Sequence, residues 1–541
     1  MLWASKLLAF ISKIDKKWDG TVPEYGADKT IFSALLDARD QFGGQRPALE
    51  DPERAPLTYN RLILGALVLG KAFADITERG EVVGLLLPSV NASVVSLFAL
   101  SAYGRVISPL NFTSGLKNIR SAIKSAEINT VITSHRFVEM AKLDDLVDGL
   151  VEQAGVRIVY LEDVRQSVTS LDKAKAVLKA PFARLLHARH ALDPHEAAVI
   201  LFTSGSEGEP KGVALTNANL ITNVSQSIRH FGPELGPPHI LLNPLPVFHS
   251  FGLMAGVLLG LYAGIKVILY PSPIQYRQVA KITCETGATI LLGTDTFLQG
   301  WMRAADDGDF DSVRFVVAGA ERVKDETRRM WAKSGTVLLE GYGVTECSPV
   351  VAVETLEHNK PGTVGRALAG QELRFEPVEG ISEGGRLYVR GPNVMAGYIY
   401  ASMPGVLVPP EDGWHDTGDI VSVDEAGYLT IRGRVKRFAK IGGEMVSLGA
   451  VETLAAELWP DGQHVAVTLP DPKKGEQIIL VTDVAHADRM AVLAQAQKNG
   501  YPELWVPRAV LVTQSIPILG SGKVDVVATT ELAKSMRAML M

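Results

Sequence analysis

The chain has 541 residues, 47% of them hydrophobic and 21% charged, which is enough for two or more domains with buried cores. A formal net charge of −6 over this length gives no overall nucleic-acid-binding character. Two cysteines, Cys284 and Cys347, are too few for a disulfide framework, and this predicts a cytoplasmic protein.

The first residues differ in character from the rest of the chain. Four apolar residues recur there at heptad-like spacing: Trp3, Leu7, Phe10 and Ile14. Lysines occupy the other faces. This pattern predicts an amphipathic helix. Residues 1–17 either make a peripheral contact with the inner face of the cytoplasmic membrane or dock on the protein's own surface. No apolar run reaches the roughly 18 residues that a membrane span needs.

From residue 81 onward, short apolar strands alternate with helical stretches, and this alternation predicts doubly wound α/β sheets. A helix is expected over residues 91–104. Strands are expected over residues 81–88, 105–111, 129–134, 156–163, 239–246, 266–273, 288–294, 313–320 and 336–343.

The texture changes near residue 384. The stretches GGRLYVRGPNVMAGYI and GYLTIRGRVKRFAK (residues 427–440) are glycine-punctuated and alternate with polar residues, which predicts a small antiparallel β subdomain. About a hundred residues of α+β character follow. We therefore expect an amphipathic segment (1–30), a large N-terminal domain (31–434) and a small mobile C-terminal domain (435–541).

The most informative loop is LFTSGSEGEPKG, residues 201–212. A buried strand leads into a run of glycines and hydroxyl side chains, whose backbone N–H groups can approach an anion closely. Phosphate is the natural ligand of such a loop. It is not a Walker A loop, because Gly212 and not a serine or threonine follows Lys211.

Eight motifs in order resemble those of the adenylate-forming superfamily of acyl-CoA synthetases, luciferases and adenylation domains. They are LFTSGSEGEPKG (201–212), PLPVFHSFGL (244–253), VAGAE (317–321), GYGVTECSP (341–349), GRLYVRGPNVMAGY (385–398), WHDTGD (414–419), GRVKRFAKIGGE (433–444) and LGSGKVD (519–525). Within the superfamily the chain looks most like the acyl-[acyl-carrier-protein] synthetase half of bacterial bifunctional 2-acylglycerophosphoethanolamine acyltransferase/acyl-ACP synthetases. Their acyltransferase motif, a histidine followed five positions later by aspartate, is missing from the eleven histidines here.

The resemblance implies an AMP-forming acid–thiol ligase. A medium- or long-chain fatty acid would attack ATP, with Mg²⁺ present, to give acyl-AMP, and the phosphopantetheine thiol of acyl carrier protein would then displace AMP. Such chemistry depends on orientation and charge neutralisation, because a carboxylate is a weak nucleophile facing an anionic triphosphate.

The resemblance also assigns roles to individual residues. The phosphate loop would comprise Thr203, Ser204, Gly205, Ser206, Gly208 and Lys211. The adenine segments would be Gly319, Ala320 and Glu321 together with Gly341, Tyr342 and Gly343. Asp419 and Arg434 would hold the ribose. Thr345 would touch the α-phosphate, Glu346 would bind Mg²⁺, and His249 would lie where the carboxylate enters. Lys436 would be the hinge, and Lys523 would be the catalytic lysine of the C-terminal domain.

The thiol acceptor is the least determined part. The domain junction carries five cations within nine residues: Arg432, Arg434, Lys436, Arg437 and Lys440. This patch could steer an acidic carrier protein, but the phosphates of coenzyme A would suit it equally. A long-chain fatty acyl-CoA ligase is therefore the alternative. A non-catalytic fatty-acid or nucleotide-binding scaffold is a further one, although the retention of Lys211, Glu346, Asp419 and Lys523 argues against it.

Overall fold

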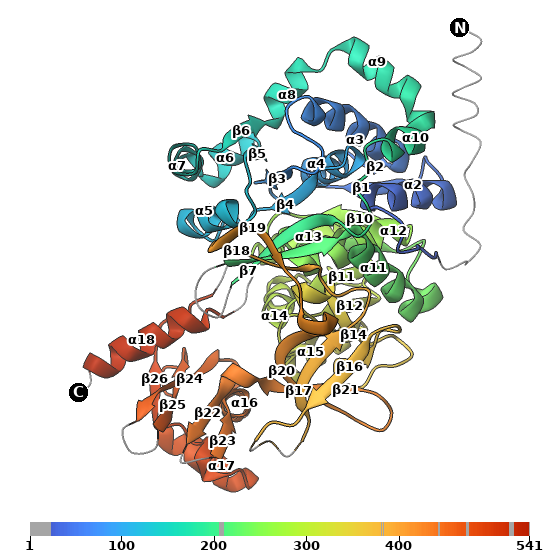
Figure 1. Cartoon of the computed structure of the whole chain (residues 1–541). Helices are drawn as coiled ribbons and strands as arrows, with labels where there is room; N and C mark the ends of the chain where they lie inside the picture. The colour runs from blue at the N-terminus through green and yellow to red at the C-terminus, as the bar shows by residue number, and fades with distance from the viewer. Residues whose placement is uncertain are drawn as a thin grey trace.

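The computed structural model describes residues 23–204, 210–379, 381, 383–441, 444–471, 475–518 and 524–539. Within them four β-sheets make up a large body and a small C-terminal domain that lies to one side of it (Figure 1). No helix among the described residues is long and apolar enough to cross a bilayer. The amphipathic helix expected at residues 1–17 falls outside the described residues.

One sheet of the body carries the phosphate-loop hairpin. Its order in the described chain is β19-β18-β8-β7-β4-β3-β5-β6. The strands are β3 (Val82–Leu85), β4 (Val106–Pro109), β5 (Thr130–Thr133), β6 (Arg157–Tyr160), β7 (Ala197–Ser204), β8 (Pro210–Thr216), β18 (Gly397–Tyr400) and β19 (Met403–Val408). Strands β3 to β6 run parallel as predicted, whereas β7, β8 and β18 are antiparallel neighbours.

The placement of β18 corrects the sequence-based expectation. The glycine-punctuated pattern predicts that its residues belong to the small antiparallel subdomain, but Tyr398 pairs with Val213 of β8 in the large sheet. Alternating polarity shows that the segment is a strand and cannot show which sheet it joins, because the partner lies far away in the sequence.

The second sheet of the body has the order β15-β14-β13-β12-β11-β9-β10-β1-β2 among the described strands. The strands are β1 (Pro47–Glu50), β2 (Leu57–Thr58), β9 (Ile240–Asn243), β10 (Lys266–Leu269), β11 (Ile290–Gly293), β12 (Phe315–Ala318), β13 (Val337–Gly343), β14 (Val350–Val353) and β15 (Arg366–Ala367). The strands β9 to β13 are all predicted from the sequence, and they pair in parallel. Their carboxyl ends therefore lie along one edge, where ligands bind in open α/β sheets.

Helices cover the faces of these two sheets. They are α2 (Ile31–Phe42), α3 (Tyr59–Ala74), α4 (Asn91–Ala102), α5 (Leu116–Ser125), α6 (His135–Ala141), α7 (Asp144–Ala154), α8 (Leu161–Ser167), α9 (Ser170–Lys179), α10 (Ala183–Ala188), α11 (Asn217–Phe231), α12 (Gly260–Tyr262), α13 (Tyr276–Thr286), α14 (Asp295–Ala304) and α15 (Asp325–Lys333). Several begin at threonine caps; the Thr216 hydroxyl, for example, accepts the N–H of Asn219 and so satisfies a donor of the first turn of α11.

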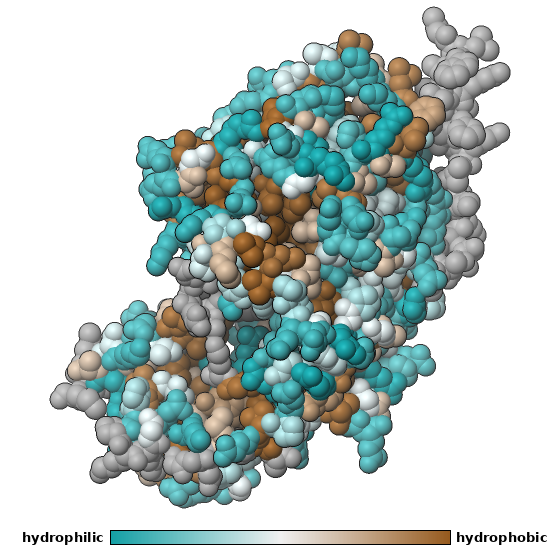
Figure 2. Space-filling view, in the orientation of Figure 1, coloured by the Kyte–Doolittle hydropathy of each residue, from teal (hydrophilic) through white to brown (hydrophobic). Residues whose placement is uncertain are grey.

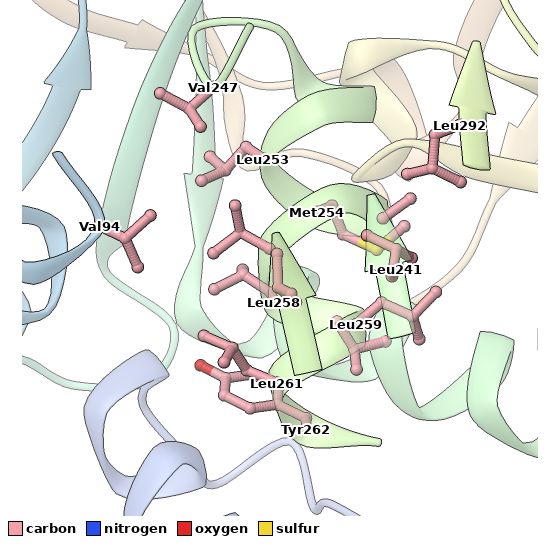
Figure 3. Packing of buried hydrophobic residues seen from close by; sticks show 14 of the residues in the cluster. Val94, Leu241, Val247, Leu253, Met254, Leu258, Leu259, Leu261, Tyr262 and Leu292 are labelled. Carbon is pink, nitrogen blue, oxygen red and sulfur yellow. The ribbon is translucent and has the colours of Figure 1, made fainter. Parts of the chain in front are cut away.

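The stretch after β9 forms a π-helix, η3 (Phe251–Leu259), which is an uncommon conformation for so many residues. Three glycines four residues apart, Gly252, Gly256 and Gly260, lie where a Cβ atom would overlap neighbouring atoms. The helix therefore rests directly on β9 and β10. Its other side chains join the main core, where Met254 lies close to Leu241 of β9 (Figure 3).

The remaining strands form two smaller sheets. The body carries β16 (Glu372–Glu376), β17 (Gly385–Arg390), β20 (His415–Val423) and β21 (Leu429–Arg434). After η6 (Val435–Arg437) the C-terminal domain contains β22 (Phe438–Ile441), β23 (Glu444–Ser447), β24 (His464–Asp471), β25 (Gly475–Thr482) and β26 (Ala509–Val512), with α16 (Leu448–Leu458), α17 (Arg489–Asn499) and α18 (Val526–Met539). The predicted strand region 427–440 is thus divided between the two sheets.

The C-terminal domain has hydrophobic clusters of its own, built on α16, α17 and the strands from β22 onward. Its contacts with the body include a hydrogen bond at 3.1 Å, in which Arg322 Nη1 donates to Thr453 Oγ1 of α16. The two parts are therefore separate packing units joined at a limited contact, which is the arrangement that a moving domain requires.

Candidate active site

The β7–β8 hairpin presents the ends of the phosphate loop. Thr203 and Lys211 are cross-strand partners, so the hydroxyl-bearing and the lysine arms of the loop lie side by side. Gly205, Ser206 and Gly208 lie outside the described residues. Beyond the hairpin, β18 places two tyrosine rings beside Lys211, whose Nζ lies 5.3 Å from the ring centroid of Tyr398 and 5.7 Å from that of Tyr400. Both distances are within the range of a cation–π interaction.

Tyr398 also contacts the residue predicted to bind metal. Its hydroxyl donates a hydrogen bond to Glu346 Oε1 at 2.7 Å, while the main-chain oxygen of Glu346 accepts the N–H of Met395 at 2.8 Å. Burial, together with the nearby Glu346 charge, raises the pKa of Tyr398, so the phenol stays protonated and remains a donor. One tyrosine therefore connects the lysine of the phosphate loop to the carboxylate after β13.

Thr345 begins η4 (Thr345–Cys347), the turn that follows β13. Its hydroxyl oxygen lies 3.2 Å from that of Ser250, the residue before the π-helix η3. His249 precedes Ser250, is half-buried, and packs its ring at 4.8 Å from that of Phe248. The structure thus brings the predicted α-phosphate contact and the residue predicted to lie where the carboxylate enters onto adjoining turns.

The predicted adenine and ribose residues form a direct chain of contacts. Tyr342 donates its hydroxyl hydrogen to Asp419 Oδ2 at 2.6 Å, and Arg434 Nε lies 3.0 Å from Oδ1. Asp419 and Arg434 are cross-strand partners on β20 and β21, which fixes their approach. Burial raises the pKa of Asp419, and the Arg434 charge opposes that rise. The carboxylate side chain is 3% exposed and Arg434 is 65% exposed, so the cation shields a nearly buried anion.

His415 is a buried residue that sequence reasoning does not single out. It begins β20, and its ring centroid lies 6.4 Å from that of Tyr398. Burial lowers the pKa of His415, although the carboxylates of Glu346, Asp416 and Asp419 oppose this shift. A neutral imidazole can pack in this position without adding charge between the proposed metal and ribose carboxylates.

The other adenine segment follows β12. Gly319 donates its N–H to Gly293 O at 3.1 Å, and Ala320 has a φ of 68°, which is uncommon for a residue with a Cβ atom. Glu321 accepts the N–H of Thr296 at 3.0 Å, and burial raises the pKa of its carboxyl group. The Glu321 side chain therefore stabilises the conformation of this loop, and the adenine ring could contact the main chain of the loop.

Gly341 and Gly343, also predicted to lie beside adenine, are on β13. A Cβ atom on Gly343 would overlap the main-chain oxygen of Pro349, so glycine is required where β13 turns back toward β14. This explains physically why a glycine stands just before the Thr345–Glu346 pair.

An apolar pocket adjoins the His249 turn. Val247, Phe248 and Leu253, which flank His249 in sequence, line it. Its other lining residues come from β3, β4, α4 and the segments beside them: Leu85, Leu87, Ser93, Val94, Leu97 and Pro109. An aliphatic group placed next to His249 would find an apolar environment there.

The described side chains also permit a test of the Mg²⁺ assignment. No group of three or more histidine, cysteine, aspartate or glutamate side chains that could hold a metal ion occurs in the described part of the chain. Glu346 is partly exposed and close to the lysine arm of the phosphate loop. Mg²⁺ commonly binds one or two carboxylates and completes its coordination with water and substrate phosphates, so a single carboxylate here fits a nucleotide-bound ion.

Besides the loop residues Ser204, Gly205, Ser206 and Gly208, two further predicted residues remain without a described side chain. The backbone of Lys436 lies in η6, between the last strand of the body and the first strand of the C-terminal domain. Lys523 lies outside the described residues. Tyr398, Tyr400, Ser250 and His415 are not predicted from the sequence although all four lie within or directly after the quoted motifs, because nothing in the motif order indicates which side chains meet.

Comparison with known proteins concerns the family and the fold. A family model described as "AMP-binding enzyme" matches residues 36–399. The chain is 28% identical over 524 residues to "Probable CoA ligase CCL9" of Humulus lupulus, covering 92% of this chain and 95% of that protein. It is 25% identical over 528 residues to a long-chain-fatty-acid–CoA ligase of Bacillus subtilis, covering 92% and 93%. The crystal structure of ATP-bound MatB from Rhodopseudomonas palustris has the same fold, with a TM-score of 0.78 at 23% identity over 95% of this chain and 100% of that one.

Proposed function

The chain belongs to the AMP-binding enzyme family, and from this premise we propose that it is a fatty acyl-CoA ligase. The family reaction is ATP-dependent activation of an acid through acyl-AMP, followed by transfer to a thiol. The observation that carries the proposal is the pair of contact chains at the site. Tyr398 joins Lys211 to Glu346, and Asp419 joins Tyr342 to Arg434.

In the first half-reaction a carboxylate oxygen of the fatty acid attacks the α-phosphorus of ATP. The new P–O bond forms as the bond to the β-phosphate oxygen breaks, and pyrophosphate leaves. Lys211 and the loop from Thr203 through Ser204, Gly205, Ser206 and Gly208 neutralise the β- and γ-phosphates. Thr345 donates to the α-phosphate. Glu346, held by Tyr398, would bind the Mg²⁺ that neutralises the phosphate charge.

The nucleoside is held at the other end of the site. Tyr342 and the loop Gly319–Glu321 enclose adenine, while Asp419 accepts hydrogen bonds from the ribose hydroxyls. A carboxylate has about four acceptor positions, so Asp419 can keep its Tyr342 and Arg434 contacts while it binds ribose. This arrangement orients the α-phosphate toward the His249 turn, where the acid enters.

The proposed acid is aliphatic. The pocket beside His249 is lined by leucine, valine, phenylalanine and proline side chains and a single serine, Ser93. The Ser93 hydroxyl donates to Val90 O at 2.7 Å and accepts the Val90 N–H at 3.3 Å, so its polarity is satisfied within the protein. The pocket has a free volume of about 10 Å³, roughly that of one water molecule, so an acyl chain would enter it by displacing lining side chains. Each methylene buried against them would then contribute about 0.8 kcal/mol, which favours an aliphatic acid over a charged or polar one.

In the second half-reaction a thiolate sulfur attacks the acyl carbonyl, AMP leaves, and the thiol proton passes to solvent. The relatives favour coenzyme A as the acceptor, because they are CoA ligases. Three of the five junction cations already contact carboxylates of this chain: Arg432 with Glu383, Arg434 with Asp419, and Arg437 with Glu452. This pairing reduces the attraction of the junction for any anionic acceptor, so the cations do not discriminate between coenzyme A and an acidic carrier protein. Acyl carrier protein is the second candidate, supported by the motif resemblance alone.

The test has two stages. Fatty-acid-dependent exchange of labelled pyrophosphate into ATP, measured with acids of several chain lengths, is expected to proceed and to favour aliphatic acids. The loss of exchange with every acid would identify a binding scaffold instead. CoA and holo-acyl carrier protein are then supplied separately with ATP and the preferred acid. We expect thioester with CoA, and faster transfer to the carrier protein would reverse the assignment of the acceptor.

A further inference from the structure

The segment between β6 and β7 has no part in the proposed chemistry. It consists of α8, α9, the turn η1 (Ala180–Phe182) and α10, which run along the outer edge of the body at the top of Figure 1. Within α9 a single residue, Ala176, is buried, and α10 buries Ala183 and His187. The segment therefore contacts the body with one narrow face.

That face is firmly fixed. His187 Nδ1 lies 2.9 Å from Ala102 O and its Nε2 lies 2.6 Å from Thr30 Oγ1, so both ring nitrogens are engaged. Arg184 pairs with Asp37 at 2.7 Å and with Asp40 at 2.6 Å on α2. Because α10 is anchored in this way, the opposite face of the segment has a defined outward direction.

The outward face is apolar. Four large side chains are strongly exposed: Leu171 62%, Leu178 62%, Phe182 63% and Leu185 57%. Within α9, at about 100° per residue, Leu171 and Leu178 lie about 20° apart and about 140° or more from the buried Ala176. Within α10, Leu185 lies about 160° from both Ala183 and His187, and Phe182 ends the turn η1 between the two helices. Figure 2, in the orientation of Figure 1, shows hydrophobic residues at the outer edge of the molecule over α9. This stripe, four large and strongly exposed apolar side chains within 15 residues, exceeds the scattered single ones that a soluble surface ordinarily carries.

Cations border the stripe. Residues 170–190 contain Lys173, Lys175, Lys179, Arg184 and Arg189 against one acid, Asp172, although the whole chain has a net charge of −6. The Asp172 carboxylate caps the first turn of α9 through Thr169. An apolar stripe with lysines beside it is the pattern of a helix that lies in the plane of a membrane, where long lysine side chains reach back to the headgroups.

We propose that this face, comprising Leu171, Leu178, Phe182 and Leu185 with Lys175 and Lys179 beside the α9 leucines, docks the protein on an anionic phospholipid bilayer. The charge selects this occupant over two others. A second copy on a two-fold axis would set lysines against lysines. The N-terminal segment carries Lys6, Lys13, Lys16 and Lys17 and would be repelled.

Binding of the full-length protein to vesicles tests the proposal. Half-saturating lipid is measured by co-sedimentation with vesicles of phosphatidylglycerol and phosphatidylcholine and with vesicles of phosphatidylcholine alone. We expect preferential binding to the anionic vesicles. The variants L178Q/F182Q and K175E/K179E should each need about tenfold more lipid, because the first loses apolar insertion and the second loses headgroup attraction.

Matched controls are I274Q and M490Q, which replace apolar residues that are 66% and 65% exposed elsewhere and should bind as wild type. Circular dichroism and thermal midpoints confirm that all variants fold. If L178Q/F182Q binds vesicles as tightly as wild type, the proposal is overturned. It is also overturned if L7Q/F10Q, which alters the N-terminal segment, is the only variant that loses vesicle binding. A dimer seen by light scattering that L178Q/F182Q abolishes would assign the face to self-association instead. None of these results depends on the enzyme's substrate.

Discussion

Tyr398 illustrates how much of the site depends on single side chains. Its ring faces Lys211 and its hydroxyl binds Glu346, although Glu346 lies 52 positions earlier in the chain. The motif order predicts both charged partners, because lysine after a glycine loop and glutamate after a strand are chemically informative. It cannot predict the tyrosine between them, since a phenol at the end of a strand usually serves packing.

Asp419 offers a residue-level test of nucleotide binding. D419N keeps the shape of the side chain but removes the negative charge of the carboxylate that should accept hydrogen bonds from the ribose hydroxyls. Hydrogen bonds to a charged group contribute about 1.5–3 kcal/mol, so the KM for ATP in pyrophosphate exchange should rise about 10- to 100-fold.

The control for D419N is D306N, which removes a comparable aspartate–arginine contact on the surface, between Asp306 and Arg277 at 2.6 Å. This variant should leave the KM for ATP unchanged, because surface ion pairs contribute little. Equal effects of the two substitutions would exclude Asp419 as a nucleotide contact.

At the scale of elements, the strand periodicity predicts β3 to β6 and β9 to β13, and the structure confirms them. Continuous apolar runs bounded by glycine and proline identify buried parallel strands well. The π-helix η3 and the outer segment α8–α10 are not predicted. The π-helix depends on the close packing of glycines against β9. The course of α8–α10 depends on which helical face the body covers. Hydrophobic periodicity alone encodes neither of these contacts.

The glycine face of η3 makes a prediction about stability. In G256A the new methyl group would overlap the side chain of Asn243, a buried residue whose Nδ2 donates to Gly252 O at 3.0 Å and whose Oδ1 accepts the Leu245 N–H at 3.1 Å. Displacing Asn243 should cost about 1–3 kcal/mol, measured as a lower denaturation midpoint in urea.

The matched control is G449A in α16, where the atom nearest to the added methyl group, Ser447 Oγ, would lie at an ordinary 3.6 Å. There the greater helix propensity of alanine should stabilise its domain by up to about 1 kcal/mol. A G256A protein as stable as wild type would show that η3 can move away from β9.

At the scale of the whole molecule, the proposed mechanism requires the C-terminal domain to approach the nucleotide. The body and this domain have separate cores, and their contacts include the hydrogen bond between Arg322 and Thr453. The sequence predicts two units from the change in texture after residue 384. It cannot predict their relative placement, because the contacts between the two units join residues far apart in the sequence, such as Arg322 and Thr453.

Lys523 provides the corresponding prediction. K523A should lower the rate of adenylation by about a hundredfold or more, since the ammonium would stabilise charge developing at the α-phosphate. Thioester formation from supplied acyl-AMP should be retained, because that step no longer involves pyrophosphate departure. K534A, on the exposed face of α18 where Lys534 pairs with Glu531 at 2.7 Å, is the control and should leave both steps unchanged. Equal loss of both steps in K523A would refute the assigned role.

The pairing of β18 with β8 has a consequence during biosynthesis. Gly397 pairs with Ala214, so β18 leaves the ribosome roughly 180 residues after its partner β8. At typical translation speeds this is a delay of about 10 to 40 s, in which β8 of the nascent polypeptide presents unpaired main-chain groups. Chaperone occupancy on stalled translation intermediates should therefore be highest before residue 397 emerges and should fall once that strand closes the ladder.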